Sequence, residues 1–170
     1  MRVRAFSLIE LAAVLLVLAV VAAAVTLRVA GPMHRAGMNG LVAEIVSFDR
    51  LTRTWSVEQD AGARLVVDLS EGRLRRTDER GRAQGAAMEV PSGYRLGRVL
   101  VGGENRSGGR TAVPVSRHGL ARSYAILVEG PGRGQRWILM AGLTGQHEVL
   151  DDERKIREVL ALLETRGDAG

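Results

Sequence analysis

The sequence predicts an α+β protein with three parts. A long N-terminal helix spans a membrane with its first half and packs with its second half on an antiparallel β-sheet or β-sandwich head, and a short helix ends the chain. Three observations predict this fold: a long apolar run near the N-terminus, a middle region of short apolar segments bounded by glycines, and an amphipathic pattern near the C-terminus. The 170 residues provide room for one compact domain plus an anchor.

The composition excludes several kinds of chemistry. No cysteine is present, which rules out disulfides, thiolate metal sites, cysteine nucleophiles and a lipoprotein anchor. The chain carries 24 basic and 19 acidic residues, and Lys155 is the only lysine. Acidic residues are interspersed with the arginines, so we interpret the positive excess as a mixed solvated surface rather than as a surface for nucleic acid or anionic lipid.

The N-terminal segment has the charge and the length of a membrane anchor. Residues 1–5 form a leader with two arginines and no acidic residue, and an almost wholly apolar run follows from Phe6 to Leu27. These 22 residues reach roughly 33 Å as a helix, which is enough to cross a hydrocarbon core of about 30 Å. We therefore predict a transmembrane helix at residues 6–28. By the positive-inside rule, the leader lies in the cytoplasm and the remaining chain on the other side of the membrane.

Glu10 is the exception within the apolar run. A carboxylate in lipid costs about 2.5–3.5 kcal/mol on insertion scales, so its position needs an explanation. Three interpretations are possible. Glu10 lies close enough to the membrane interface to remain hydrated, or it belongs to an ordinary secretory signal peptide cleaved at Ala22–Ala24, or it pairs with a cationic group of another chain. The residues alone leave these three interpretations open.

The residues around Glu10 resemble a known processing site. Ala5-Phe6-Ser7-Leu8-Ile9-Glu10, followed by an aliphatic run, is similar to the prepilin cleavage site of type IV pilins and type II secretion pseudopilins. The resemblance implies that a prepilin peptidase cuts between Ala5 and Phe6 and that the new amine of Phe6 is methylated. It also implies that Glu10, at the fifth mature position, neutralises the N-terminal amine of a neighbouring subunit. Ala5 replaces the usual glycine, and its extra methyl group is expected to slow cleavage.

This resemblance implies a structural role, that of a minor pseudopilin in a type II secretion pseudopilus. Such a subunit is single-pass in the inner membrane, with a cytoplasmic N-terminus and a periplasmic head. Its implied partners are the prepilin peptidase, other pseudopilin or pilin subunits, and an inner-membrane assembly platform.

Two alternatives to this role remain. One is a secreted β-domain behind an ordinary signal peptide. The other is a minor type IV pilin, and a DNA-binding form of it is suggested by five arginines, although the acidic residues among them argue against nucleic acid as a partner. These arginines are Arg73, Arg75, Arg76, Arg80 and Arg82.

After the anchor, the helical pattern continues toward the head. Gly31-Pro32 is expected to kink or briefly interrupt the helix, and Gly62 to mark its exit, so that residues 29–62 form its periplasmic half. One stripe at spacings of three and four is expected to face the head: Met38, Leu41, Ile45, Phe48, Thr52 and Trp55. The following residues are assigned to the opposite, polar face: Glu44, Asp49, Arg50, Arg53 and Glu58.

Residues 63–150 are predicted to form the β-rich head. Leu65–Leu69 and Gly72–Arg75 are typical of a β-hairpin around Ser70-Glu71-Gly72. Five further short segments, rich in Val, Ile, Leu or Tyr, are predicted as strands: Tyr94–Val101, Thr111–Val115, Ser123–Glu129, Arg136–Ala141 and Gln146–Leu150. Because no helix pattern separates them, the strands are expected to pair antiparallel.

A second and looser resemblance lies in the later part of the head. It runs from Val113-Pro114-Val115 through Gly119 to Trp137-Ile138-Leu139 and Thr144-Gly145. This pattern is similar to the head of H-type minor pseudopilins. It favours the secretion system over the pilus.

A final amphipathic helix is predicted at residues 151–165. Asp151-Asp152-Glu153 opens it, as suits the positive end of a helix dipole, and Glu153 with Arg157 forms an i,i+4 pair. Its apolar stripe is expected to pack on the head: Ile156, Val159, Leu160 and Leu163. This helix is not a standard element of the family's head, which suggests an extension of one lineage.

No catalytic site, metal site or cofactor is predicted. His34, His118 and His147 lie in unrelated contexts and lack the spacing of metal ligands. The glycine-rich segment from Gly103 to Thr111 lacks the lysine and the following helix of a phosphate-binding loop, so we interpret it as a hairpin loop. No nucleophile elbow is present either. We therefore expect a protein that is not an enzyme.

Overall fold

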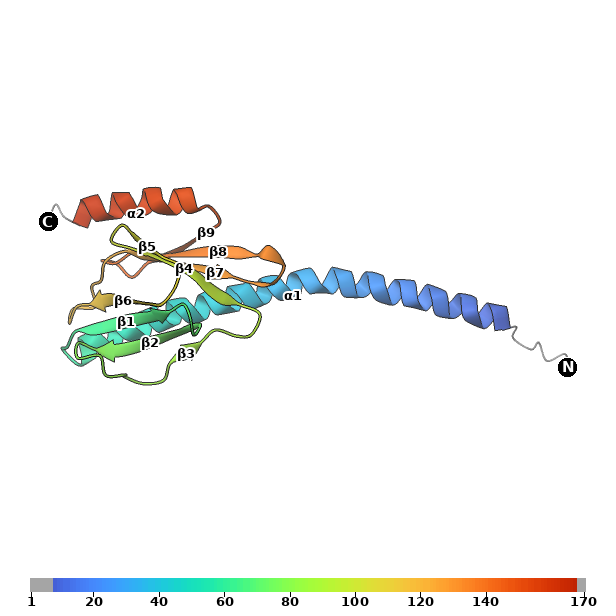
Figure 1. Cartoon of the computed structure of the whole chain (residues 1–170), viewed down its shortest axis with the longest axis horizontal. Helices are drawn as coiled ribbons and strands as arrows, with labels where there is room; N and C mark the ends of the chain where they lie inside the picture. Colours follow the sequence, from blue (N-terminus) through green and yellow to red (C-terminus); the bar gives the residue numbers. More distant parts are fainter. Residues whose placement is uncertain (1–7, 168–170) are drawn as a thin grey trace. The chain divides into compact units, whose positions relative to one another are not determined.

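The computed structural model describes the backbone of residues 8–167 and the side chains of residues 14–19, 37–132 and 134–163. The chain divides into two compact units, one ending at residue 38 and one beginning at residue 39. The first unit and the start of the second are joined by one continuous helix, α1 (Leu8–Glu58). The second unit is the head, and it contains the last part of α1, all nine described strands and helix α2 (Glu153–Gly167) (Figure 1).

The strands form two antiparallel sheets. The four-stranded sheet has the order β3-β2-β1-β6, and the five-stranded sheet has the order β5-β4-β7-β8-β9. The first sheet consists of β1 (Ala63–Asp68), β2 (Arg73–Asp78), β3 (Met88–Glu89) and β6 (Arg110–Val115). The second consists of β4 (Arg95–Val101), β5 (Glu104–Arg106), β7 (Tyr124–Glu129), β8 (Gln135–Met140) and β9 (His147–Leu150). A short 3₁₀ turn, η1 (Pro131–Arg133), joins β7 to β8.

The predicted strands are confirmed, and so is their antiparallel pairing. The expected first hairpin is β1–β2, in which Val67 lies opposite Leu74 across the turn. Two strands were not predicted. β3 has only two residues, of which Met88 is buried, and β5 has three residues that are all exposed. Neither strand is therefore long and apolar enough to be recognised from its sequence.

The head part of α1 buries one side in the core, and the assignment of its polar face was wrong at two positions. Leu41, Ile45 and Thr52 are buried as expected. Asp49 and Arg53, which we assigned to the solvent, are 2% and 8% exposed. Burial of these charges is possible because they pair with one another and with other polar groups of the head.

The course of α1 differs from expectation at two points. The helix is uninterrupted at Gly31-Pro32, so of the two predicted effects, a kink or a brief interruption, the interruption was wrong and the kink stays a prediction. Proline removes a single backbone hydrogen bond there, which a long helix can tolerate. The helix also ends at Glu58, before the predicted exit at Gly62, because Asp60 adopts a left-handed conformation with φ of 46°.

The five-stranded sheet is covered on both faces. On one face, Leu127 and Trp137 form a core cluster with Ile156 and Leu160 of α2, which confirms that the C-terminal helix packs on the head. On the other face, Tyr124 reaches α1. Figure 1 shows β7 and β8 between α2 and the head part of α1. The sheet is therefore held between two helices.

The four-stranded sheet packs against the same helix by one face. Arg76 of β2 lies 5.3 Å from the centre of the Trp55 ring and donates a hydrogen bond to the carbonyl oxygen of Leu51 at 3.2 Å. Burial lowers the pKa of Arg76 from its ordinary value. On the inner positions of β1, Leu65 and Val67 are fully buried. The end of α1 is thus shared by the two sheets.

Candidate functional site

The residues of the predicted processing site lie at the edge of the structure. Ala5 and Phe6 are outside the described residues. Glu10 falls within α1, but its side chain is not among those described. The predictions of cleavage, methylation and assembly therefore stay predictions.

The described part of the N-terminal unit presents apolar side chains on every side of the helix. Val14, Leu15, Leu16, Val17 and Leu18 are between 48% and 68% exposed. Five consecutive helical residues point in directions about 100° apart, so they surround the helix axis completely. Within the chain itself these side chains have little cover.

No helix with a long enough apolar stretch to cross a membrane occurs among residues whose side chains are described. Only residues 14–19 of the predicted span at residues 6–28 have described side chains, since those of residues 1–13 and 20–36 are not described.

A buried polar cluster connects α1 to the five-stranded sheet. Nε of Arg53 and Oδ2 of Asp49 are 2.7 Å apart, one helical turn from each other. The hydroxyl of Tyr124 at the start of β7 donates a hydrogen bond to the other carboxylate oxygen of Asp49, also at 2.7 Å. Burial, followed by the charge of Asp49, raises the pKa of Tyr124 well above 10.0. The phenol therefore stays protonated and acts as a donor.

Arg53 extends this cluster to two loops of the head. One guanidinium nitrogen donates hydrogen bonds to the carbonyl oxygens of Gly119, at 3.1 Å, and of Gly142, at 2.6 Å. Its other terminal nitrogen is buried and has no partner among the described groups. Gly142 has no room for a side chain, since an added Cβ would lie 2.6 Å from the backbone nitrogen of Ser123. The cluster thus fixes α1 against loops that are distant in sequence.

This cluster was not predicted from the sequence, although the pattern of α1 contains a signal for it. Buried positions on α1 follow the spacing of three and four through Ile45 and Val46, then Asp49, then Thr52 and Arg53. The predicted stripe was chosen from apolar residues, so the charged residues Asp49 and Arg53 were not included in it. An acid and an arginine at i and i+4 on the apolar side of a helix are the signal that could have identified a buried pair.

The arginines that suggested a DNA-binding surface do not form one continuous unpaired surface. Arg76 is directed to α1, as described above. Arg73 and Arg75 are ion-paired with Glu71, and Arg82 lies 3.9 Å from Asp78. Acidic groups therefore compensate most of this positive charge, which weakens the interpretation as a nucleic-acid surface.

The histidines give no sign of a metal centre in the part of the chain that the structure describes. His118 and His147 are exposed, and no group of three potential ligand residues gathers within that part. The side chain of His34 is not described. The expectation of no metal site rests on the sequence.

Comparison with known proteins gives one similar structure. No family model matches the chain, and no curated protein matches it. Among solved structures, the chain is similar to the minor pseudopilin EpsH from the type 2 secretion system of Vibrio cholerae. The two chains are 13% identical, the match covers 64% of this chain and 92% of that one, and the TM-score is 0.48.

Proposed function

We propose that the chain is a pilin-like structural subunit, anchored and assembled through its N-terminal helix. Within that class, we propose a minor pseudopilin of a type II secretion pseudopilus. The observation that carries the proposal is the motif from Ala5 to Glu10, in register with a basic leader before it and an apolar run after it. A minor type IV pilin would share this motif, and the resemblance of the head to H-type pseudopilins favours the secretion system.

The organisation of the structure is compatible with this role. A single helix, α1, continues from the apolar segment into the head, where Asp49 and Arg53 fix it by buried hydrogen bonds. The described apolar side chains from Val14 to Leu18 are exposed all around that helix. In a filament, helices of neighbouring subunits and surrounding lipid would cover them.

Glu10 has a specific role in the proposal. Its carboxylate is unfavourable in an apolar segment unless it meets a positive charge. Removal of the leader takes away two arginines and creates a free amine at Phe6. The same amine on an adjacent subunit would supply the partner for Glu10. Processing of the leader would then be the step that permits assembly.

Incorporation of a Glu10→Ala variant into filaments tests this role. We expect the variant to insert in the membrane and to fold normally, because Glu10 lies outside the head. We expect its cross-linking to other subunits in the assembled pseudopilus to fall by about tenfold or more, since a desolvated ion pair is lost. Secretion should fall with it.

Glu44→Ala provides the matched control for that experiment. Glu44 is an exposed glutamate on the head part of the same helix and makes no ion pair within the described chain. This variant should be cross-linked as efficiently as the unchanged protein. Normal incorporation of Glu10→Ala would show that the carboxylate is only an interfacial residue, and it would contradict the proposed assembly mechanism.

A further inference from the structure

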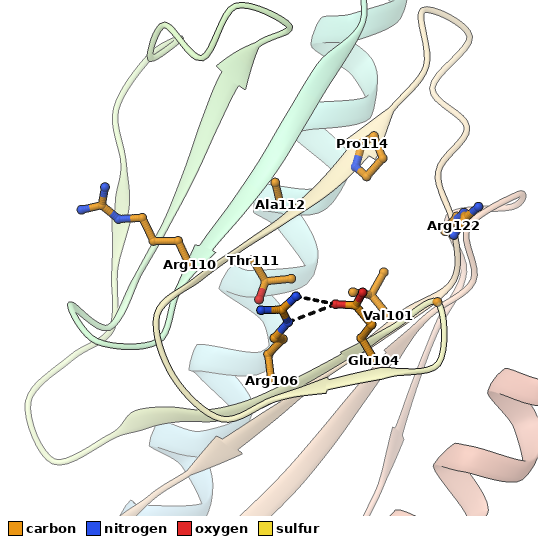
Figure 2. A pocket seen from close by; sticks show the side chains of 9 residues that line it. Val101, Glu104, Arg106, Arg110, Thr111, Ala112, Pro114 and Arg122 are labelled. Atoms are coloured by element: carbon orange, nitrogen blue, oxygen red, sulfur yellow. Dashed lines mark hydrogen bonds and ion pairs between the residues drawn. The ribbon is translucent and has the colours of Figure 1, made fainter.

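A groove lies beside the outer edge of β6, where the two sheets approach each other (Figure 2). Its volume is about 320 Å³. Side chains of β4, β5 and β6 and of the segment before β7 line it, and the lining includes three arginines. The lining residues include Glu104, Arg106, Arg110, Thr111, Ala112 and Arg122.

The three arginines of the groove differ in their partners. Arg110 lies 2.7 Å from Asp68 on the neighbouring strand and points away from the groove in Figure 2. Its hydrogen bond holds the pKa of Asp68 below the ordinary value of 3.8. Arg106 pairs with Glu104 at 2.7 Å, and both side chains are more than half exposed. The side chain of Arg122 is exposed and makes no hydrogen bond or ion pair with any described residue. The groove therefore holds one free guanidinium and one that is only loosely engaged.

Thr111 adds a second polar group that lacks a partner. This residue is only 8% exposed, and its hydroxyl oxygen makes no hydrogen bond within the described chain. A buried hydroxyl without a partner is unfavourable, and native structures rarely retain one. Thr111 lines the groove on the same side as Arg106. A ligand with acceptor oxygens would provide the missing partner.

The backbone of β6 is available along the same groove. β6 is an edge strand, and β1 is its neighbour on the other side. The carbonyl oxygen of Gly109, just before β6, accepts a hydrogen bond from the backbone N–H of Leu69, just after β1, so it points toward β1. Since successive residues of an antiparallel strand direct their backbone groups to opposite edges, Ala112 directs its N–H and C=O away from β1. No named strand of the described chain pairs with that edge at Ala112, and an isolated bridge between Val115 and Ala121 closes the edge just beyond Pro114.

We propose that this groove binds an extended, acidic segment of a partner protein. A glutamate or aspartate side chain of the segment would lie between Arg122 and Arg106, and its oxygens would accept hydrogen bonds from these groups and from Thr111. Backbone groups of the segment would pair with Ala112 over a short distance, because Pro114 has no N–H to extend the ladder. If the proposed function holds, the partner is a neighbouring subunit of the filament.

Glu104 has a defined place in this proposal. Its carboxylate forms an ion pair with Arg106 in the free protein, so the carboxylate of a bound segment must compete with Glu104 for this guanidinium. The pair is exposed and therefore weak, which makes the exchange possible. Removing the charge of Glu104 should free Arg106 and strengthen binding.

The test uses the full chain in a neutral detergent and a fluorescein-labelled hexaglutamate peptide, with fluorescence anisotropy as the readout. We expect saturable binding that weakens as salt is added. Arg122→Gln should weaken it about tenfold and Thr111→Val about threefold to fivefold, whereas Glu104→Gln should strengthen it severalfold. Arg80→Gln is the matched control, because it removes an exposed arginine outside the groove and should leave binding unchanged. The melting temperature of each variant verifies its fold.

Several outcomes would overturn the proposal. They are no saturable binding of hexaglutamate, equal binding of a hexaglutamine peptide, and equal losses for Arg80→Gln and Arg122→Gln. Inorganic phosphate that displaces the peptide at comparable concentration would indicate a free-anion site, and duplex DNA that binds through Arg122 would indicate a nucleic-acid site. Peptide binding does not depend on leader cleavage or assembly, so failure of this test and failure of the proposed function can be distinguished.

Discussion

The guanidinium of Arg53 donates a hydrogen bond of 2.6 Å to the carbonyl oxygen of Gly142, and both residues are buried. The contact joins α1 to the loop between β8 and β9, which lies 89 positions further along the chain. The same side chain pairs with Asp49 on its own helix and reaches Gly119 on a second loop. One arginine therefore holds the end of a long helix in a defined position within the head.

Replacement of Arg53 by methionine should destabilise the head strongly. The change leaves the Asp49 carboxylate buried with Tyr124 as its remaining donor, and removal of one partner of a buried pair costs about 3–5 kcal/mol. Chemical denaturation of the full chain in mild detergent, followed by near-ultraviolet circular dichroism, measures the effect. Arg50→Met, on the exposed side of the same helix, should change stability by less than about 0.5 kcal/mol. Equal effects of the two substitutions would show that the buried cluster contributes little.

Replacement of Gly142 by alanine should also destabilise the head, for a steric reason. The added methyl group would overlap the carbonyl oxygen of Ala121 and the backbone of the next two residues, which are not flexible side-chain ends. Overpacking of this kind costs about 1–3 kcal/mol. Gly108→Ala is the control, since no atom lies within 4 Å of its added methyl group. Thermal unfolding should separate the two variants, and a normal melting temperature for Gly142→Ala would mean that the loop can move away from β7.

Much of the head could be predicted from the sequence, because its strands carry their own local signal. The strand segments are short and rich in Val, Ile, Leu or Tyr, and glycines bound most of them. The five longer segments and the first hairpin were therefore located correctly. The strands β3 and β5 were not predicted, because their formation depends on pairing with neighbouring strands rather than on a pattern of side chains. The division of the strands between two sheets also depends on long-range pairing, which local patterns do not encode.

The buried cluster shows a different limit of sequence reasoning. A charge at a helical position is ordinarily exposed, so Asp49 and Arg53 were assigned to the solvent. Their burial depends on partners from remote parts of the chain, namely Tyr124, Gly119 and Gly142. The processing motif at Ala5 and Phe6 is the reverse case. It is recognised from the sequence alone, and both residues lie outside those that the structure describes.

The attachment of α2 should weaken in acid. Glu153 accepts hydrogen bonds from Arg157 at 2.7 Å and from Arg98 at 2.6 Å, and the Arg157 bond is the main reason that its pKa lies below the ordinary 4.5. A carboxyl whose pKa is lowered in the folded state stabilises that state above its unfolded pKa, and the stabilisation is lost as pH falls through the folded pKa. Glu153→Gln should therefore melt at lower temperature than the unchanged protein at neutral pH.

That difference in melting temperature should disappear in acid, below the lowered pKa of Glu153. Glu148→Gln is the control, because Glu148 is exposed on β9 and has no ion pair within the described chain. Melting curves across a pH series give the comparison. A difference between Glu153→Gln and the unchanged protein that stays constant with pH would contradict the role of the carboxylate charge.

The intact mass of the chain purified from membranes of cells that contain a prepilin peptidase tests the central claim most directly. The account predicts a chain that begins at Phe6, lacks the five leader residues and carries one added methyl group on its amine. Fragmentation of the N-terminal peptide would locate that methyl group. Ala5→Gly should be processed faster, because glycine is the usual residue before the cut. A chain that keeps its leader, or one that begins after Ala24, would contradict the account.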